Sequence, residues 1–164
     1  MRREQFVVDP IDGTRGFIEG RDMWCVSVGV IENSRPVAGV LVCPAREQIL
    51  KASSGAGAYL NDVQDKTYGT DEKFERHPHV PSLAYRIALV AMGQMTATFV
   101  KPNAHDWDIA AADIILHEAG GSLCDVDGEN FLLNQENPKK SVMFATHPEF
   151  SKKMLAIVTE TPFS

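Results

Sequence analysis

The chain has 164 residues, of which 44% are hydrophobic and 23% are charged, a composition typical of a globular domain with its own core. Its 22 acidic and 16 basic residues give a formal net charge of −6 without a basic run, which argues against a nucleic-acid polymer as partner. No apolar stretch reaches the length of a membrane span and the N-terminus lacks the apolar run of a signal peptide, so we expect no membrane association. Three widely spaced cysteines in apolar surroundings indicate reduced thiols and a cytoplasmic protein: Cys25, Cys43 and Cys124.

In chain order, the first half of the sequence predicts an antiparallel meander. Alternating and apolar runs separated by turn residues predict strands at 4–8, 24–32, 37–43 and 48–53. We expect the first of these strands to be buried. Residues 61–81 are polar and aperiodic, and they predict a long loop.

The second half predicts helices alternating with short strands. A helix over 82–92 begins with Ser82 as a candidate N-cap, and a strand follows at 96–100. The clearest helix covers 107–121 and ends at two glycines; its predicted apolar stripe consists of Ile109, Ala112, Leu116 and Ala119. Strands at 122–126 and 141–146 and a last helix from about Pro148 complete a single α/β domain over residues 1–164.

The stretch VVDPIDGTRGF places two carboxylates, Asp9 and Asp12, three residues apart. Such crowding raises the proton affinity of each acid, so it needs a compensating role. The structural interpretation is a turn at Asp9-Pro10 and a helix cap at Asp12 for a helix starting at Thr14 or the next residue. The chemical interpretation is that both carboxylates and the Ile11 carbonyl converge on one hard cation, for which oxygen ligands suit Mg²⁺.

The residues after Asp12 favour the chemical interpretation. Gly13 lets the backbone approach a ligand closely, and free amides at a helix start bind anions. Thr14 adds a hydroxyl beside the expected cation. Acids, cation, anion site and hydroxyl together are typical of phosphate chemistry.

A second acidic group lies in the sequence HDWDIAAAD, at the start of the predicted helix. Asp106 and Asp108 could simply stabilise the helix dipole from its first turn. Alternatively, one of them could complete a cation cluster with Asp9 and Asp12. Three basic residues outside these motifs are expected to be solvated surface: Lys51, Arg76 and Arg86.

Taken together, VVDPIDGTRGF and WDIAAADIILHEAGG resemble the two signature motifs of the inositol monophosphatase superfamily, whose members are Mg²⁺-dependent phosphomonoesterases that include bisphosphate nucleotidases. The stretches VSVGVIENSRPVAGVLVCPA and GAGAYLN are similar to the central strands of that family and the turn after them. The resemblance implies a sugar-phosphatase-like layered fold with an antiparallel meander and a C-terminal α/β part.

The resemblance also implies roles for individual residues. Asp9 and Asp12 would be carboxylate ligands and Ile11 a carbonyl ligand, while Asp108 would hold a second cation. Gly13 and Thr14 would offer amides to the phosphate, and Thr14 would help to orient the attacking water. Mg²⁺ is the implied cofactor, with Mn²⁺ as a possible substitute, and a small phosphorylated molecule is the implied substrate.

Two departures from the family pattern lead to further expectations. The family has a metal-binding glutamate upstream of the first motif, whereas only eight residues precede Asp9 here. We therefore expect an N-terminally truncated member, either an active phosphatase or a catalytically silent chain that binds without turnover, and an exposed sheet face that favours a homo-oligomer. In inositol-specific members an acid lies shortly before the WD motif; the matching Lys101 here predicts a preference for a bisphosphate such as 3'-phosphoadenosine 5'-phosphate.

Overall fold

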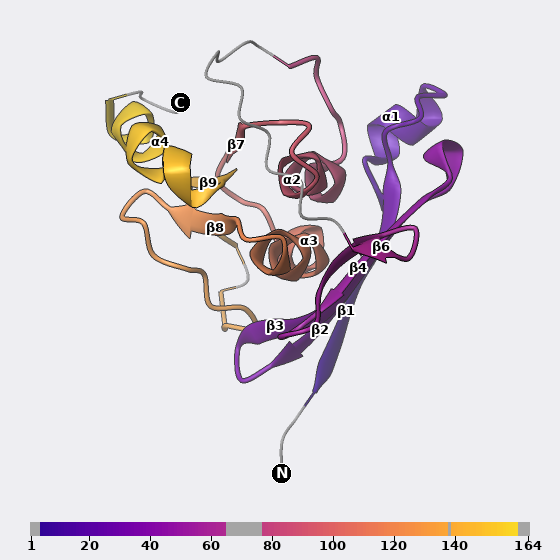
Figure 1. Ribbon diagram of the computed structural model, residues 1–164, viewed down its shortest axis with the longest axis horizontal. Helices are drawn as coiled ribbons and strands as arrows, with labels where there is room; N and C mark the ends of the chain where they lie inside the picture. The colour runs from indigo at the N-terminus through magenta and orange to yellow at the C-terminus, as the bar shows by residue number, and fades with distance from the viewer. Residues whose placement is uncertain (1–3, 65–76, 138, 161–164) are drawn as a thin grey trace.

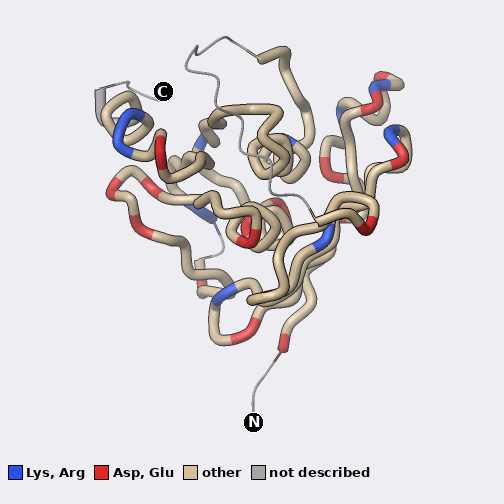
Figure 2. The backbone as a smooth tube through the Cα atoms, viewed as in Figure 1, with Lys and Arg blue, Asp and Glu red and all other residues tan. Residues whose placement is uncertain are grey.

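The computed structural model describes residues 4–64, 77–137 and 139–160, whose helices and strands lie in successive layers (Figure 1). A six-stranded antiparallel sheet packs against helices α2 and α3, a three-stranded antiparallel sheet lies on the other side of these helices, and α4 contacts the small sheet. This mixed α/β arrangement confirms the predicted fold class. Acidic and basic residues are interspersed along the backbone (Figure 2).

The large sheet is a meander in which each strand pairs with the next one along the chain. Its strands are β1 (Gln5–Asp12), β2 (Cys25–Glu32), β3 (Arg35–Cys43), β4 (Gln48–Ser53), β5 (Gly57–Leu60) and β6 (Val63–Gln64). A short helix α1 (Thr14–Ile18) follows β1, and a 3₁₀ turn η1 (Pro44–Arg46) joins β3 to β4. The predicted turn before β3 is a two-residue hairpin, because Asn33 and Ser34 both adopt positive φ angles of 51° and 63°.

The second half follows the predicted order. Its elements are α2 (Leu83–Ala91), β7 (Ala97–Val100), α3 (Asp106–Glu118), β8 (Ser122–Asp125), β9 (Met143–Thr146) and α4 (Pro148–Glu160). The small sheet has the strand order β7-β9-β8. Ser82 is the N-cap of α2 as predicted, because its Oγ accepts a hydrogen bond of 3.0 Å from the Tyr85 amide. Gly120, with φ 90°, ends the helical chain after α3.

Helix α3 lies directly on the large sheet because small residues meet there. A Cβ atom built on Gly29 would lie 2.8 Å from the Ala110 Cβ, and one built on Gly39 would lie 2.7 Å from the Ala111 Cα. The predicted single apolar stripe was too narrow: every residue from Ile109 to Leu116 is buried. A helix packed between two sheets buries its whole circumference, so its apolar positions no longer follow one face.

Several predictions about the first half need correction. Strand β1 is an exposed edge rather than a buried strand, with Phe6 69% and Val8 51% exposed. The stretch expected as a loop over 61–81 contains the two-residue strand β6, and residues 77–81 form neither helix nor strand, as expected, whereas residues 65–76 lie outside the described residues. All three cysteines are buried and free, as expected. Among the described residues, no helix has the length and apolar character needed to cross a membrane.

Candidate metal centre between β1 and α3

A β-bulge in β1 brings Asp9 and Asp12 to one face of the sheet. Asp9 pairs with Ser27 and Asp12 pairs with Cys25, so β1 has one more residue than β2 between these pairs. Without the extra residue, side chains three positions apart would point to opposite faces of the strand. Pro10 fits within the bulge of an edge strand because it has no amide hydrogen to donate to the ladder.

Asp12 is the buried member of this pair, with an exposed fraction of 6%. Its Oδ2 accepts hydrogen bonds from the Ser82 hydroxyl and, at 2.7 Å, from the Ala84 amide at the start of α2. Burial raises the pKa of Asp12 to about 6, although these two hydrogen bonds lower it. The charges of Asp9 and Asp108 also raise it. The structural interpretation in which Asp12 caps α1 was therefore wrong. The Asp12 carboxylate accepts its backbone hydrogen bond from the first turn of α2, and Gly13 occupies the N-cap of α1 without a side-chain bond.

Asp108 reaches the site from the first turn of α3. Its Oδ2 accepts a hydrogen bond of 2.7 Å from the backbone amide of His105, the N-cap residue, so the acid does stabilise the helix start. The His105 ring stacks on the Trp107 ring with their centroids 4.4 Å apart. Burial raises the pKa of Asp108, the hydrogen bond from His105 lowers it, and the charge of Asp9 raises it. Capping and a place in the cluster are therefore compatible roles for one side chain.

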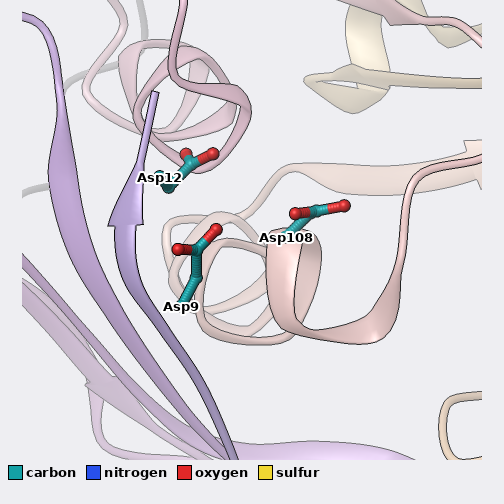
Figure 3. A group of neighbouring side chains, drawn as sticks. All are labelled: Asp9, Asp12 and Asp108. Atoms are coloured by element: carbon teal, nitrogen blue, oxygen red, sulfur yellow. The ribbon is translucent and has the colours of Figure 1, made fainter. Parts of the chain in front are cut away.

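The three carboxylates converge (Figure 3). Asp9, Asp12 and Asp108 each offer an oxygen atom, and these atoms all lie within 4.8 Å of one another. Three acids this close repel one another unless a cation lies between them, and the charges of Asp9 and Asp108 add to the effect of burial in raising the pKa of Asp12. An all-oxygen donor set in a partly buried position suits a hard divalent cation such as Mg²⁺ or Mn²⁺.

The residues next to Asp12 form a compact turn at the entrance of α1. Thr14 donates its hydroxyl hydrogen to the Ile11 carbonyl at 2.8 Å, which leaves that carbonyl a second lone pair for another partner. Gly13 has φ 87°, and a Cβ there would lie 2.9 Å from the Ser82 Cβ. Only glycine therefore combines this backbone angle with the close approach to α2. The first amides of α1 have no partner within the helix.

A buried ion pair holds the start of α3 in place. Lys140 Nζ lies 2.8 Å from Asp106 Oδ1, and both side chains are less than one-tenth exposed. The second carboxylate oxygen of Asp106 accepts a hydrogen bond of 2.6 Å from the Asn134 amide. Asp106 thus anchors the segment before β9 to the helix and does not join the cluster, while Asp108 does.

The sequence singled out two basic residues outside the acidic motifs, Arg86 and Lys101, and the structure shows how exposed each one is. Arg86 on α2 was expected to be solvated, but it is half-buried, and its Nε has no hydrogen-bond partner among the described residues. Burial lowers the pKa of its guanidinium, while the Asp12 charge raises it. Its position one helical turn after Ser82 could have indicated that it shares the Asp12 side of α2. Lys101 is exposed in the segment after β7, and no contact among the described residues joins it to the three acids.

A layered fold with a carboxylate cluster between an edge strand and a helix start defines a sugar-phosphatase-like protein with a candidate cation site. The sequence model of the inositol monophosphatase family matches residues 2–82 and 64–161 of this chain. The chain belongs to the inositol monophosphatase family, as its two motifs predicted.

Individual relatives agree with this assignment. The chain is 31% identical over 162 residues to the Nus factor SuhB of Haemophilus influenzae, covering 81% of this chain and 61% of the relative. It is 28% identical over 162 residues to an inositol-1-monophosphatase of Mesorhizobium japonicum, covering 80% of this chain and 60% of the relative. The solved inositol monophosphatase from Anabaena shares the fold, with a TM-score of 0.85 at 19% identity over 97% of this chain and 73% of that one. The chain thus spans about three fifths of the length of these two curated relatives.

Proposed function

We propose that this chain is a metal-dependent phosphomonoesterase that hydrolyses a small phosphorylated molecule, with Mg²⁺ as its cation and Mn²⁺ as a substitute. The observation that carries the proposal is the convergence of Asp9, Asp12 and Asp108 beside the first amides of α1. A divalent cation held there would supply Lewis-acid chemistry to a phosphate ester. Relatives named inositol-1-monophosphatase and histidinol-phosphatase support the phosphatase class and leave a range of substrates.

The chain's own residues have distinct tasks in this proposal. The amides of Gly13 and Thr14 bind phosphate oxygens, because the start of α1 offers hydrogen-bond donors without intrahelical partners. The Thr14 hydroxyl orients the attacking water. Its hydrogen bond to the Ile11 carbonyl fixes the rotamer of the Thr14 side chain. Asp12 acts as a ligand whose position is fixed by Ser82 and the start of α2.

Release of inorganic phosphate from small phosphate esters, with and without millimolar Mg²⁺, tests the proposal. Asp108→Asn keeps a polar side chain at the cap of α3 but removes one ligand charge, so it should abolish both Mg²⁺ binding in calorimetry and phosphate release. Asp62→Asn is the matched control, because the Asp62 side chain is 85% exposed and lies outside the cluster. Phosphate release that is unaffected by a chelator and by Asp108→Asn would contradict the proposal.

The proposed substrate preference depends on Lys101. The exposed Lys101 ammonium suits a second phosphate group better than a neutral polyol, so we infer that 3'-phosphoadenosine 5'-phosphate is preferred over inositol 1-phosphate. Lys101→Ala should reduce that preference by raising KM for the bisphosphate while leaving kcat for the monophosphate unchanged. A higher kcat/KM for inositol 1-phosphate in the unmodified chain would reverse the inference.

A second candidate function is ligand binding without turnover. Three carboxylates carry less negative charge than two divalent cations carry positive charge, so the described residues by themselves favour one occupied cation position. Calorimetry that finds tight Mg²⁺ and phosphate binding in a chain without measurable phosphate release would favour this function. In either case we place the protein in the cytoplasm, on the strength of its three free buried thiols, and we propose that it self-associates.

A further inference from the structure

Two aromatic rings lie beside the candidate cation site, at the start of α3. His105 is the N-cap residue of that helix, and Trp107 lies in its first turn, directly before Asp108. The centroids of the two rings are 4.4 Å apart and their planes are 11° from parallel, a stacked arrangement that restrains both rings. We call this pair the aromatic shelf.

The aromatic shelf is held by the same elements that form the cation site. The His105 amide donates a hydrogen bond of 2.7 Å to Asp108 Oδ2, and the Nδ1 atom of the ring lies 3.7 Å from that oxygen. The Ser27 hydroxyl donates a hydrogen bond of 3.4 Å to the Trp107 carbonyl, and Ser27 pairs with Asp9 in the large sheet. The two rings therefore keep a fixed position relative to two of the three carboxylates.

Trp107 presents part of its ring to solvent. Its exposed fraction is 41% although the imidazole covers one face of the indole, so the exposed area lies on the opposite face and the edges. The packing of α3 between the two sheets does not depend on this ring, because the buried apolar residues of the helix begin at Ile109. A restrained and accessible indole is suited to stack on a flat ring of a ligand, since stacking requires no hydrogen-bond partner.

We propose that the aromatic shelf binds a flat, unsaturated ring in the leaving group of the substrate, and that Trp107 selects such phosphate esters over those of saturated alcohols. This inference rests on the phosphatase function proposed above and concerns the substrate class of the same site. Neighbouring Cα atoms lie about 3.8 Å apart, so Trp107 is one residue step from the proposed ligand Asp108. A phosphate bound at the acidic cluster therefore leaves a ring that is joined to it by a short linker within reach of the indole.

Benzyl phosphate and cyclohexylmethyl phosphate test the aromatic shelf, because their leaving groups have the same carbon skeleton and only one of the two rings is flat and unsaturated. With Mg²⁺, kcat/KM for benzyl phosphate should exceed that for cyclohexylmethyl phosphate by about tenfold. Trp107→Leu should remove most of this ratio, whereas Trp107→Phe should keep part of it, because phenylalanine retains a stacking face. Comparing the ratio between variants cancels any intrinsic difference in the reactivity of the two esters.

Phe6→Leu is the matched control, because it removes an aromatic ring that is 69% exposed on β1 and lies outside the acidic cluster. It should leave the ratio unchanged. Adenosine 3'-monophosphate and histidinol phosphate then distinguish a nucleobase from an imidazole as the bound ring. The ester that has the higher kcat/KM in the unmodified chain, and loses more of it with Trp107→Leu, identifies the ring.

Fluorescence separates a failure of this inference from a failure of the phosphatase proposal. The chain has two tryptophans, and Trp24→Phe leaves Trp107 as the only indole. With Mg²⁺ present, adenosine 3'-monophosphate or histidinol phosphate should quench its emission, and glycerol 2-phosphate should not. Quenching without phosphate release would support the aromatic shelf and contradict the proposed activity. Phosphate release with a benzyl preference that is absent or survives Trp107→Leu would overturn the aromatic shelf alone, as would an indole that neither ring-bearing phosphate quenches.

Discussion

Replacing Asp12 by Asn should stabilise the chain in the absence of metal and remove its response to metal. The pKa of Asp12 is raised from 3.8 to about 6, mainly by burial, so the ionised carboxylate is held at a cost in the folded state. At about 1.4 kcal/mol for each pH unit between those values, the cost at pH 7 is about 3 kcal/mol. An asparagine retains an acceptor for Ser82 and the Ala84 amide, and it can turn its NH₂ group toward Asp9 and Asp108.

Thermal melts at pH 7 with a chelator measure this gain. For a chain of this length, about 3 kcal/mol corresponds to a rise in Tm of about 6–12 °C. The gain should shrink as the pH falls through 6 and vanish near 3.8, because the wild-type Asp12 then carries a proton and no longer bears the cost of a buried charge. Millimolar Mg²⁺ should raise the Tm of the wild type, since the cation binds only the folded state, and should leave that of Asp12→Asn unchanged.

Asp62→Asn is again the control, because it removes a charge from a side chain that is 85% exposed. It should change neither the Tm with chelator nor the shift with Mg²⁺. If Asp12→Asn lowers the Tm of the metal-free chain, or responds to Mg²⁺ as the wild type does, the three acids do not form the site described above.

Other substitutions test the supports of the site. Gly13→Ala should destabilise the chain by about 1–3 kcal/mol in urea unfolding, and by more than Gly20→Ala, because both have positive φ but only a Cβ at Gly13 meets an atom within 4 Å. Lys140→Met should cost about 3–5 kcal/mol by leaving Asp106 buried without its cation, and the double variant Lys140→Met/Asp106→Leu should recover most of that loss. Burial raises the pKa of Asp113 to about 6, so Asp113→Asn should raise the urea midpoint at pH 8 and have no effect near pH 4.

The sequence predicted those elements whose residues interact locally. The helix over 82–92 was placed within a residue at each end because its N-cap and its periodic apolar residues are neighbours along the chain. The strand at 48–53 was placed correctly for the same reason. By contrast, β5 and β6 have only four and two residues, too few for a period to show. They are strands because β5 pairs with β4 and β6 pairs with β5.

The partners of the candidate site could not be read from the sequence. Ser82 was recognised as an N-cap, yet its hydroxyl also donates to Asp12, 70 positions earlier, and that contact depends on how α2 packs at the end of β1. The partial burial of Arg86 has the same origin. A tertiary contact of this kind leaves no periodic signal in either segment, so each residue was assigned only its local role.

The bulge in β1 shows how local and tertiary requirements combine. A strand that keeps perfect alternation cannot present Asp9 and Asp12 on the same face, since three positions separate them. The extra residue of the bulge corrects this parity, and it occurs at an edge where a proline costs no ladder hydrogen bond. The D-P-x-D spacing is therefore what a bulged edge strand requires to aim two carboxylates at one point. In a strand without the extra residue, an acid three positions after Asp9 would lie on the opposite face, and its carboxylate would point away from Asp108.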